Sequence, residues 1–276
     1  MYSIPPSFCD FISPDCDRAA FIQNYLNSAG IKTCLMPMEG KKHIYVSFPK
    51  SQYNPMFRIK TVIAHYDRIG IGANDNSAAV FCLMEWARSC SVPELVEGPH
   101  MIQPHNIRII FTDGEELGEK GGVAQQGAFP LAQMFKRLGI TNDDIFVFDC
   151  MGRGDVPILS QTVIPPQVPT AYLKSYSQLE ARAKQLLQLS SPKYFCLPCS
   201  LSDNASFIAN GIPAVAITML PSEEVPLVLE GKTPPTWQSF HTPQDNLEFL
   251  TPQSFEIFHT ILNNLAQIKT IFSSQI

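Results

Sequence analysis

Four short, almost uninterrupted apolar runs constrain the fold of this chain more than any other feature of its sequence. Each is rich in β-branched and aromatic residues, and helical patterns separate them; the runs are RIKTVIA (58–64), NIRIIFT (106–112), DIFVFD (144–149) and IPAVAIT (212–218). Strands that are covered on both faces have this continuous apolar character. Strands alternating with helices predict a doubly wound α/β sheet, mixed but mainly parallel, with helices on both faces.

The remaining elements follow from periodicity and capping residues. Apolar residues at helical spacing, Asp17 as a cap and Thr251-Pro252 as a helix start predict helices over about 17–30, 76–88, 130–138, 172–189 and from 251 onward. Residues 33–38 and 43–48 read as a strand pair. There is no internal repeat, and 276 residues are enough for one domain spanning 1–276.

Two segments lack any periodicity and are predicted to be surface loops. Residues 91–105 are rich in proline, so we expect His100 and His105 to be solvated rather than functional. Residues 221–240 form a long stretch of the kind that often acts as a lid or binding loop.

Charge and hydropathy exclude several classes of partner. A net charge of -5 and a pI near 5.7 argue against nucleic acid or an anionic membrane as the main partner. No apolar run approaches the roughly 18 residues that a membrane span needs. The first residues show neither the basic nor the apolar region of a secretory signal, so we predict a cytoplasmic protein. Its oligomeric state is left open.

The eight cysteines are predicted to be reduced thiols. Cys34, Cys82 and Cys150 fall in segments predicted to form the core. Cys196 and Cys199 form a lone CxxC without a second pair, which is more typical of ordinary buried thiols than of a metal site.

Histidine and acidic side chains follow the predicted strands where these end. The residues at these exits are His65, Asp67, Glu115, Glu116, Asp149 and, beyond the long loop, His241, with Asp75 at the start of the next helix. Because the carboxyl ends of the strands form the ligand-binding edge of an open α/β sheet, we expect these side chains at one site. Mixed histidine and carboxylate ligands suit zinc or a similar divalent ion.

Each of these features also has a structural explanation. A histidine at a strand end is often structural, Asp75 before a helix is ordinarily an N-cap, and Glu115-Glu116 can form a solvated turn. Asp149 can cap the loop that follows it. Capping does not readily explain all of them at one edge of one sheet, so a metal site is favoured.

The motifs around these residues resemble the co-catalytic di-zinc aminopeptidases, which include the bacterial leucyl aminopeptidase type and have glutaminyl cyclases as relatives. The matching stretches occur in the family's order: AHYD (64–67), GANDNSAA (72–79), DGEELGEKGG (113–122), FDCMGRGD (148–155), SDNASF (202–207) with GIPAVAI (211–217), and FHTPQDN (240–246). The resemblance implies the fold of the zinc aminopeptidases and peptide substrates.

The resemblance also implies a role for each site residue. Asp75 would bridge two zinc ions, with His65 and Asp149 completing one site. Glu116 and His241 would complete the other. Glu115 would be the general base for attack by a metal-bridging hydroxide, and Asp67 would orient His65. A cis peptide bond between Asp75 and Asn76 is expected as well.

Two positions depart from the family pattern, and the function has alternatives. Asn204 stands where members often carry a histidine, and Phe240 where some carry a tyrosine, so one oxyanion donor is in doubt. The stretch LGEKGG favours an aminopeptidase. A glutaminyl-cyclase-like acyltransferase with one zinc is the alternative, followed by another peptidase specificity or a non-catalytic metal protein. The roles of Asp203 and of residues 221–240 are left open.

Overall fold

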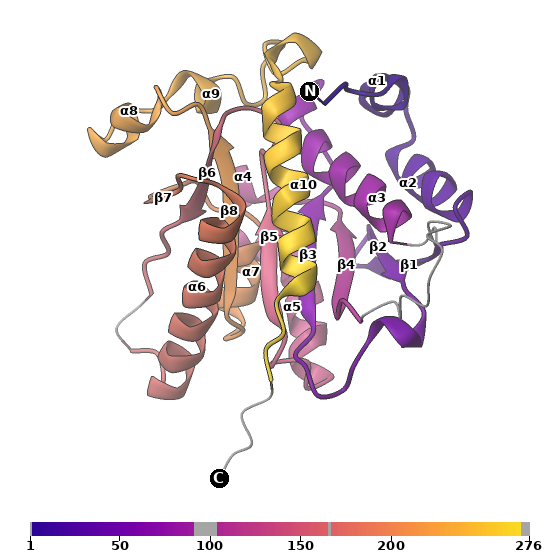
Figure 1. Cartoon of the computed structure of the whole chain (residues 1–276), viewed down its shortest axis with the longest axis vertical. Coiled ribbons are helices and arrows are strands. Elements are labelled where there is room, and N and C mark those ends of the chain that lie inside the picture. Colours follow the sequence, from indigo (N-terminus) through magenta and orange to yellow (C-terminus); the bar gives the residue numbers. More distant parts are fainter. Residues whose placement is uncertain (1, 91–103, 165–166, 272–276) are drawn as a thin grey trace.

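The computed structural model describes residues 2–90, 104–164 and 167–271, and their strands form one mixed eight-stranded sheet (Figure 1). The strand order is β1-β2-β4-β3-β5-β8-β6-β7. The strands are β1 (Lys32–Met38), β2 (Lys41–Ser47), β3 (Lys60–His65), β4 (Ile107–Thr112), β5 (Asp144–Phe148), β6 (Val156–Ser160), β7 (Phe195–Leu197) and β8 (Ala214–Leu220). The central strands β4, β3, β5 and β8 pair in parallel, which confirms the predicted doubly wound sheet.

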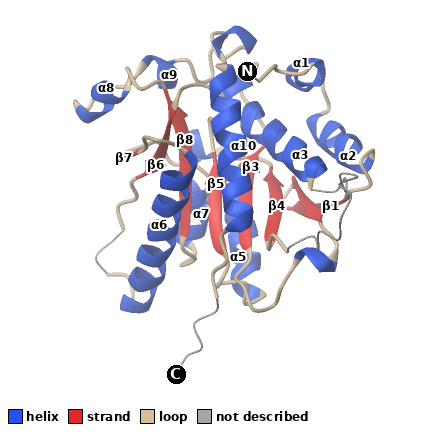
Figure 2. Ribbon diagram, in the orientation of Figure 1, coloured by secondary structure: helices blue, strands red, loops and turns tan. Residues whose placement is uncertain are grey.

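Helices cover both faces of the sheet, as predicted (Figure 1; Figure 2). The helices are α1 (Pro6–Ile12), α2 (Arg18–Asn27), α3 (Ala79–Ser89), α4 (Gly118–Gly121), α5 (Ala128–Arg137), α6 (Thr170–Ser190), α7 (Asn204–Ala209), α8 (Val225–Leu229), α9 (Pro235–Gln238) and α10 (Pro252–Gln267). Residues of α3, α6 and α10 pack in one cluster on one face, while α5 and α7 contribute to a second cluster on the other. None of the described helices combines the length and the hydropathy that a membrane crossing requires.

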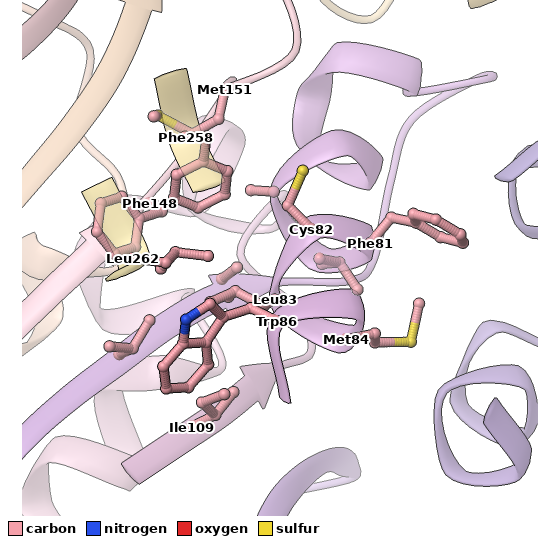
Figure 3. Packing of buried hydrophobic residues seen from close by; sticks show 14 of the residues in the cluster. Phe81, Cys82, Leu83, Met84, Trp86, Ile109, Phe148, Met151, Phe258 and Leu262 are labelled. Atoms are coloured by element: carbon pink, nitrogen blue, oxygen red, sulfur yellow. The ribbon is translucent and has the colours of Figure 1, made fainter. Parts of the chain in front are cut away.

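The larger cluster is built from the apolar stripes of α3 and α10 against the sheet (Figure 3). Phe258 of α10 lies 4.8 Å from Phe148 of β5, ring centre to ring centre. Phe255, Leu262 and Leu265 lie on the same face of α10 at helical spacing, and all three are fully buried. Since each large apolar side chain stabilises the fold by about 1.5–3 kcal/mol on full burial, this stripe fixes α10 on the sheet.

Two parts of the fold were not predicted correctly: strands β6 and β7 at one edge of the sheet, and residues 221–240 after β8. Strand β6 runs antiparallel to β8 and pairs with the three-residue strand β7; both are too short and too irregular to show a pattern. Residues 221–240 are not simply a surface loop, since they contain α8 and α9, and Thr236 is fully buried. Pro226 and Pro235 stand in the first turns of these helices, where a missing N–H costs nothing.

His105 and Cys34 also contradict their predicted environments. His105 is buried, packs edge-on against Phe48 at 4.7 Å, and accepts a hydrogen bond from the Ile107 amide. Cys34 is exposed because β1 is an edge strand. All eight cysteines are unpaired, and Cys196 and Cys199 are half-buried. His100 and the rest of the predicted loop up to residue 103 lie outside the described residues.

Candidate metal centre

Parallel pairing brings three strand exits to the same edge of the sheet. His65 ends β3 and pairs in register with Thr112, the last residue of β4. The chain then continues from β4 toward Glu115 and Glu116, and from β5 directly into Asp149. This arrangement agrees with the expected ligand-binding edge of an open α/β sheet.

The loop between β3 and α3 carries Asp75 back toward His65. Gly70 and Gly72 have positive φ angles of 72° and 59°, and a Cβ on Gly72 would lie 2.4 Å from the Asp75 carbonyl oxygen. Glycine is therefore required at residue 72. The Asp75-Asn76 peptide bond is cis, as expected. The Asn76 side chain donates to the Phe148 carbonyl oxygen and accepts from the Cys150 amide, which ties the loop to β5.

Asp245 holds this loop from the other side. Its two carboxylate oxygens accept hydrogen bonds from the amides of Asn74 and Asp75, at 2.6 and 3.0 Å. The same segment carries His241, whose φ of 61° is unusual for a residue other than glycine. Asp245 thus links two parts of the site that are distant in the sequence.

Two groups of three side chains share Asp75. His65 Nε2 lies 3.2 Å from Asp75 Oδ1 and 3.3 Å from Asp149 Oδ1. On the other side, His241 Nε2 lies 3.3 Å from Asp75 Oδ2 and 2.8 Å from Glu116 Oε2. In each group one ligand atom from every residue lies within 4.8 Å of the others. The two oxygens of one carboxylate therefore face two different histidines.

These separations fit metal coordination. Two ligand atoms about 2.0–2.1 Å from an ion, at the tetrahedral angle, lie about 3.3–3.4 Å apart. Three of the four distances match this value, and the 2.8 Å contact is an ordinary hydrogen bond. Glu116 Oε1 is buried and has no hydrogen-bond partner among the described residues. An unpaired buried carboxylate oxygen beside a histidine is the environment that a cation would complete.

The electrostatics also favour a cation. A hydrogen bond to Asp75, reinforced by the charge of Glu116, raises the pKa of His241 to about 9, against the opposing effect of burial. Burial and the charge of Asp75 raise the pKa of Glu116 well above its usual range. Carboxylates crowded in this way repel one another, and a bound divalent ion would offset that repulsion.

Asp67 contacts the backbone of Glu115 and Glu116 in addition to His65. Its carboxylate accepts from the amides of both Glu115 and Glu116 at 3.1 Å, whereas its Oδ1 lies 3.6 Å from His65 Nδ1. The nearer group to this ring nitrogen is the Asp67 carbonyl oxygen, at 3.3 Å. Asp67 therefore positions the Glu115-Glu116 backbone as well as His65.

Three further residues were not identified from the sequence. Gln126 donates to Glu115 Oε1 at 2.8 Å and accepts from the buried Ser206 hydroxyl at 2.7 Å, which fixes the Glu115 carboxylate. Glu119 Oε2 lies 3.3 Å from His241 Nδ1. The third is Asp245. Gln126 directly follows the short 3₁₀ helix Val123–Gln125, where no periodicity marks it, whereas Glu119 and Asp245 lie within the quoted motifs.

Asp203 is fully buried near the centre. The Thr112 hydroxyl donates to its Oδ2, and its Oδ1 has no partner among the described residues. Burial raises the pKa of this carboxyl to about 7. Asn204, the first residue of α7, is likewise buried.

A cavity of about 600 Å³ opens over the centre. Its lining includes Asp75, Glu115, Glu116, Glu119 and Asp149, together with Trp237 and Phe240 from the segment after β8. A smaller cavity of about 50 Å³ shares Asp149, Cys150 and Trp237 with it. Its lining also includes the small polar side chains Ser160, Ser202 and Thr218.

The model for peptidase family M28 matches residues 45–266. The fold is similar to that of the Legionella pneumophila LapA aminopeptidase, with a TM-score of 0.65 and 17% identity over 96% of this chain and 75% of that one. It is also similar to that of a leucine aminopeptidase precursor from Bacteroides thetaiotaomicron, with a TM-score of 0.66 and 17% identity over 98% of this chain and 100% of that one. The fold is similar as well to that of a glutaminyl cyclase from an Acidobacteriales bacterium, with a TM-score of 0.58 and 16% identity over 91% of this chain and 84% of that one.

The comparison with curated protein sequences gives no match. The M28 match nonetheless covers most of the chain and contains all the residues of the centre, from His65 to His241. The chain therefore belongs to peptidase family M28 and is a hydrolase that acts on peptide bonds.

Proposed function

We propose that this protein is an aminopeptidase that uses two zinc ions to release N-terminal residues from peptides. The observation that carries the proposal is the position of Asp75, whose two oxygens face His65 and His241 at 3.2 and 3.3 Å. A carboxylate placed between two histidines in this way suits a bridging ligand. The expected metal of the family is zinc, and two ions per chain is the proposed number.

Each ion would be held by one of the two groups of side chains. His65, Asp75 and Asp149 would hold one, and Asp75, Glu116 and His241 the other. Zinc bound there supplies Lewis acidity, which lowers the pKa of water and stabilises an anionic transition state. The three carboxylates offset three of the four positive charges of two zinc ions, so the pair keeps a net charge of about +1 for an anionic reactant.

Glu115 is the proposed general base. Glu115 lines the cavity and lies in the same turn as Glu116. One of its carboxylate oxygens accepts a hydrogen bond from Gln126. The other oxygen is thereby directed away from Gln126, so it is available to take a proton from water and pass it to the leaving amine. Asp67 holds the amides of Glu115 and Glu116 and so keeps the base and the ligand apart.

The charge of the cavity favours a substrate with a free amine. Five carboxylates line it, and none of the described lining residues is lysine or arginine. Glu115 and Glu119, the two lining carboxylates that are not proposed zinc ligands, can therefore attract a positively charged N-terminus, whereas a peptide's C-terminal carboxylate finds no lysine or arginine among the described lining residues. This argues for an aminopeptidase rather than a carboxypeptidase, in line with the aminopeptidases of similar fold.

Zinc content measured together with substrate preference tests the proposal. We expect up to two zinc ions at the centre, loss of activity with a chelator, and cleavage of peptides with a free N-terminus but not of N-acetylated ones. Cleavage of N-acetylated peptides at an equal rate would overturn the aminopeptidase assignment. A zinc-saturated centre with one ion, together with ring closure of N-terminal glutamine, would support the glutaminyl-cyclase-like alternative instead.

A further inference from the structure

We propose that Cys82, Glu85 and His259 form a separate site for one zinc-like divalent ion between α3 and α10. None of these residues belongs to the proposed catalytic centre. The ion would fasten the helix that follows the Asp75 loop to the C-terminal helix. The proposal concerns stability and is independent of the proposed aminopeptidase activity.

Helix geometry brings the three side chains together. Cys82 and Glu85 are three residues apart on α3, so they lie on the same face. His259 stands on the facing helix α10, one residue after Phe258, which belongs to the same buried cluster as Cys82 (Figure 3). One ligand atom from each residue lies within 4.8 Å of the other two.

The spacing resembles that of the catalytic centre. His259 Nε2 lies 3.3 Å from Glu85 Oε2, which equals the distance from His65 Nε2 to Asp149 Oδ1. Two ligand atoms of a tetrahedral zinc ion lie about 3.3–3.4 Å apart. Thiolate, imidazole and carboxylate are all zinc ligands, and the thiolate favours zinc over magnesium or calcium.

Burial and charge suit an ion as well. Cys82 is 1% exposed, whereas the side chains of Glu85 and His259 are 23% and 26% exposed, which leaves a path for an ion. Burial raises the pKa of the Cys82 thiol, so ion binding would release its proton. A thiolate, a carboxylate and a neutral imidazole then offset the two charges of the ion.

Tyr2 closes the outer side of the cluster. Its hydroxyl donates to Glu85 Oε2 at 2.5 Å, and its ring stacks on Phe255 with a centroid distance of 5.0 Å. The hydroxyl thus contacts Glu85 Oε2, the oxygen that also lies 3.3 Å from His259 Nε2. An ion here would therefore join three segments of the chain: the N-terminal residues, α3 and α10.

Cobalt substitution tests the site without reference to activity. The proposed catalytic ligands are nitrogen and oxygen atoms only, so a thiolate-to-cobalt absorption band in the near ultraviolet would report the Cys82 site. We expect the band in the cobalt-loaded full chain and its loss in Cys82→Ser. Cys150→Ser is the necessary control, because Cys150 Sγ lies 3.2 Å from the ligand oxygen Asp149 Oδ1. A band that persists in Cys82→Ser and disappears in Cys150→Ser would overturn the proposal.

Stoichiometry and stability give a second test. We expect one zinc ion fewer per chain in His259→Gln than in the parent, with kcat unchanged and a smaller rise of Tm on zinc addition. Cys90→Ser, at the end of the same helix, should behave as the parent. If Cys82→Ser does not fold, the half-exposed His259→Gln still decides: an unchanged zinc content and an unchanged zinc-dependent rise of Tm would contradict the site.

The outcome is separable from that of the proposed function. A cobalt–thiolate band in a protein without aminopeptidase activity would support this site and contradict the function. An active aminopeptidase without the cobalt–thiolate band would support the proposed function and contradict the Cys82 site.

Discussion

The two clusters of proposed metal ligands are built on different kinds of backbone. The proposed catalytic centre takes its residues from strand ends and loops, where Gly72 and His241 adopt positive φ angles. The Cys82 cluster takes its residues from the regular faces of α3 and α10. In the first, the two oxygens of one carboxylate, Asp75, face two histidines, whereas in the second each residue offers one ligand atom to a single group.

The difference predicts where substitutions are most costly. In the loop-built centre each side chain is held by others, as Glu115 is by Gln126, so one change alters a network. In the helix-built cluster one change removes one ligand from helices that apolar packing already holds in place. The predictions below probe this contrast.

The largest expected effect is on Glu115. Glu115→Gln should keep both zinc ions and lower kcat by about 10²–10⁴-fold, because only the proton transfer is lost. The measurement is kcat together with zinc content. A variant with normal kcat would show that another group acts as the base.

Glu116→Gln provides the matched contrast within the same turn. Its carboxylate lies 2.8 Å from His241, so the substitution should weaken one zinc site and leave about one ion in the centre. Zinc titration of both variants distinguishes ligand from base. Equal zinc loss in Glu115→Gln and Glu116→Gln would contradict the assignment.

Substrate choice should depend on the small cavity beside Asp149. Its volume is about 50 Å³, roughly a third of the ~150 Å³ cavity that accepts benzene in an engineered core. N-terminal alanine or serine should therefore be released with kcat/KM about 10–200-fold higher than phenylalanine. A panel of dipeptides measures this, and Cys82→Ser should give the same ranking as the parent. A preference for phenylalanine would mean that the cavity does not hold the substrate's first side chain.

Asp67→Asn should have a smaller effect. The amide cannot accept from both backbone N–H groups as the carboxylate does, so the turn that carries Glu116 loosens. We expect zinc affinity to fall about 10–100-fold, with activity restored by excess zinc. Asp10→Asn on the surface of α1 is the control, and no change in affinity would assign Asp67 a purely structural role.

Much of this arrangement follows from local sequence patterns, and the exceptions have physical causes. The four central strands were predictable because burial on both faces demands continuous apolar runs, and their exits then located the histidines and carboxylates. The pairing of β6 with β7 depends on contacts between distant segments, which leave no local pattern in five and three residues. His105 was predicted to be solvated because it ends a proline-rich segment without periodicity, whereas its neighbours in space are Phe48 and Trp86.

The hydrogen bonds from Asn74 and Asp75 to Asp245 span 171 and 170 positions of sequence. A growing chain leaves the ribosome from its N-terminus, so the loop with Asp75 emerges long before the segment that anchors it. Until residues 241–245 have been made, the loop lacks its carboxylate support and the second proposed zinc site lacks its histidine. The centre can therefore be complete only after residue 245 has been made, and nascent chains that stop before it would hold an incomplete centre.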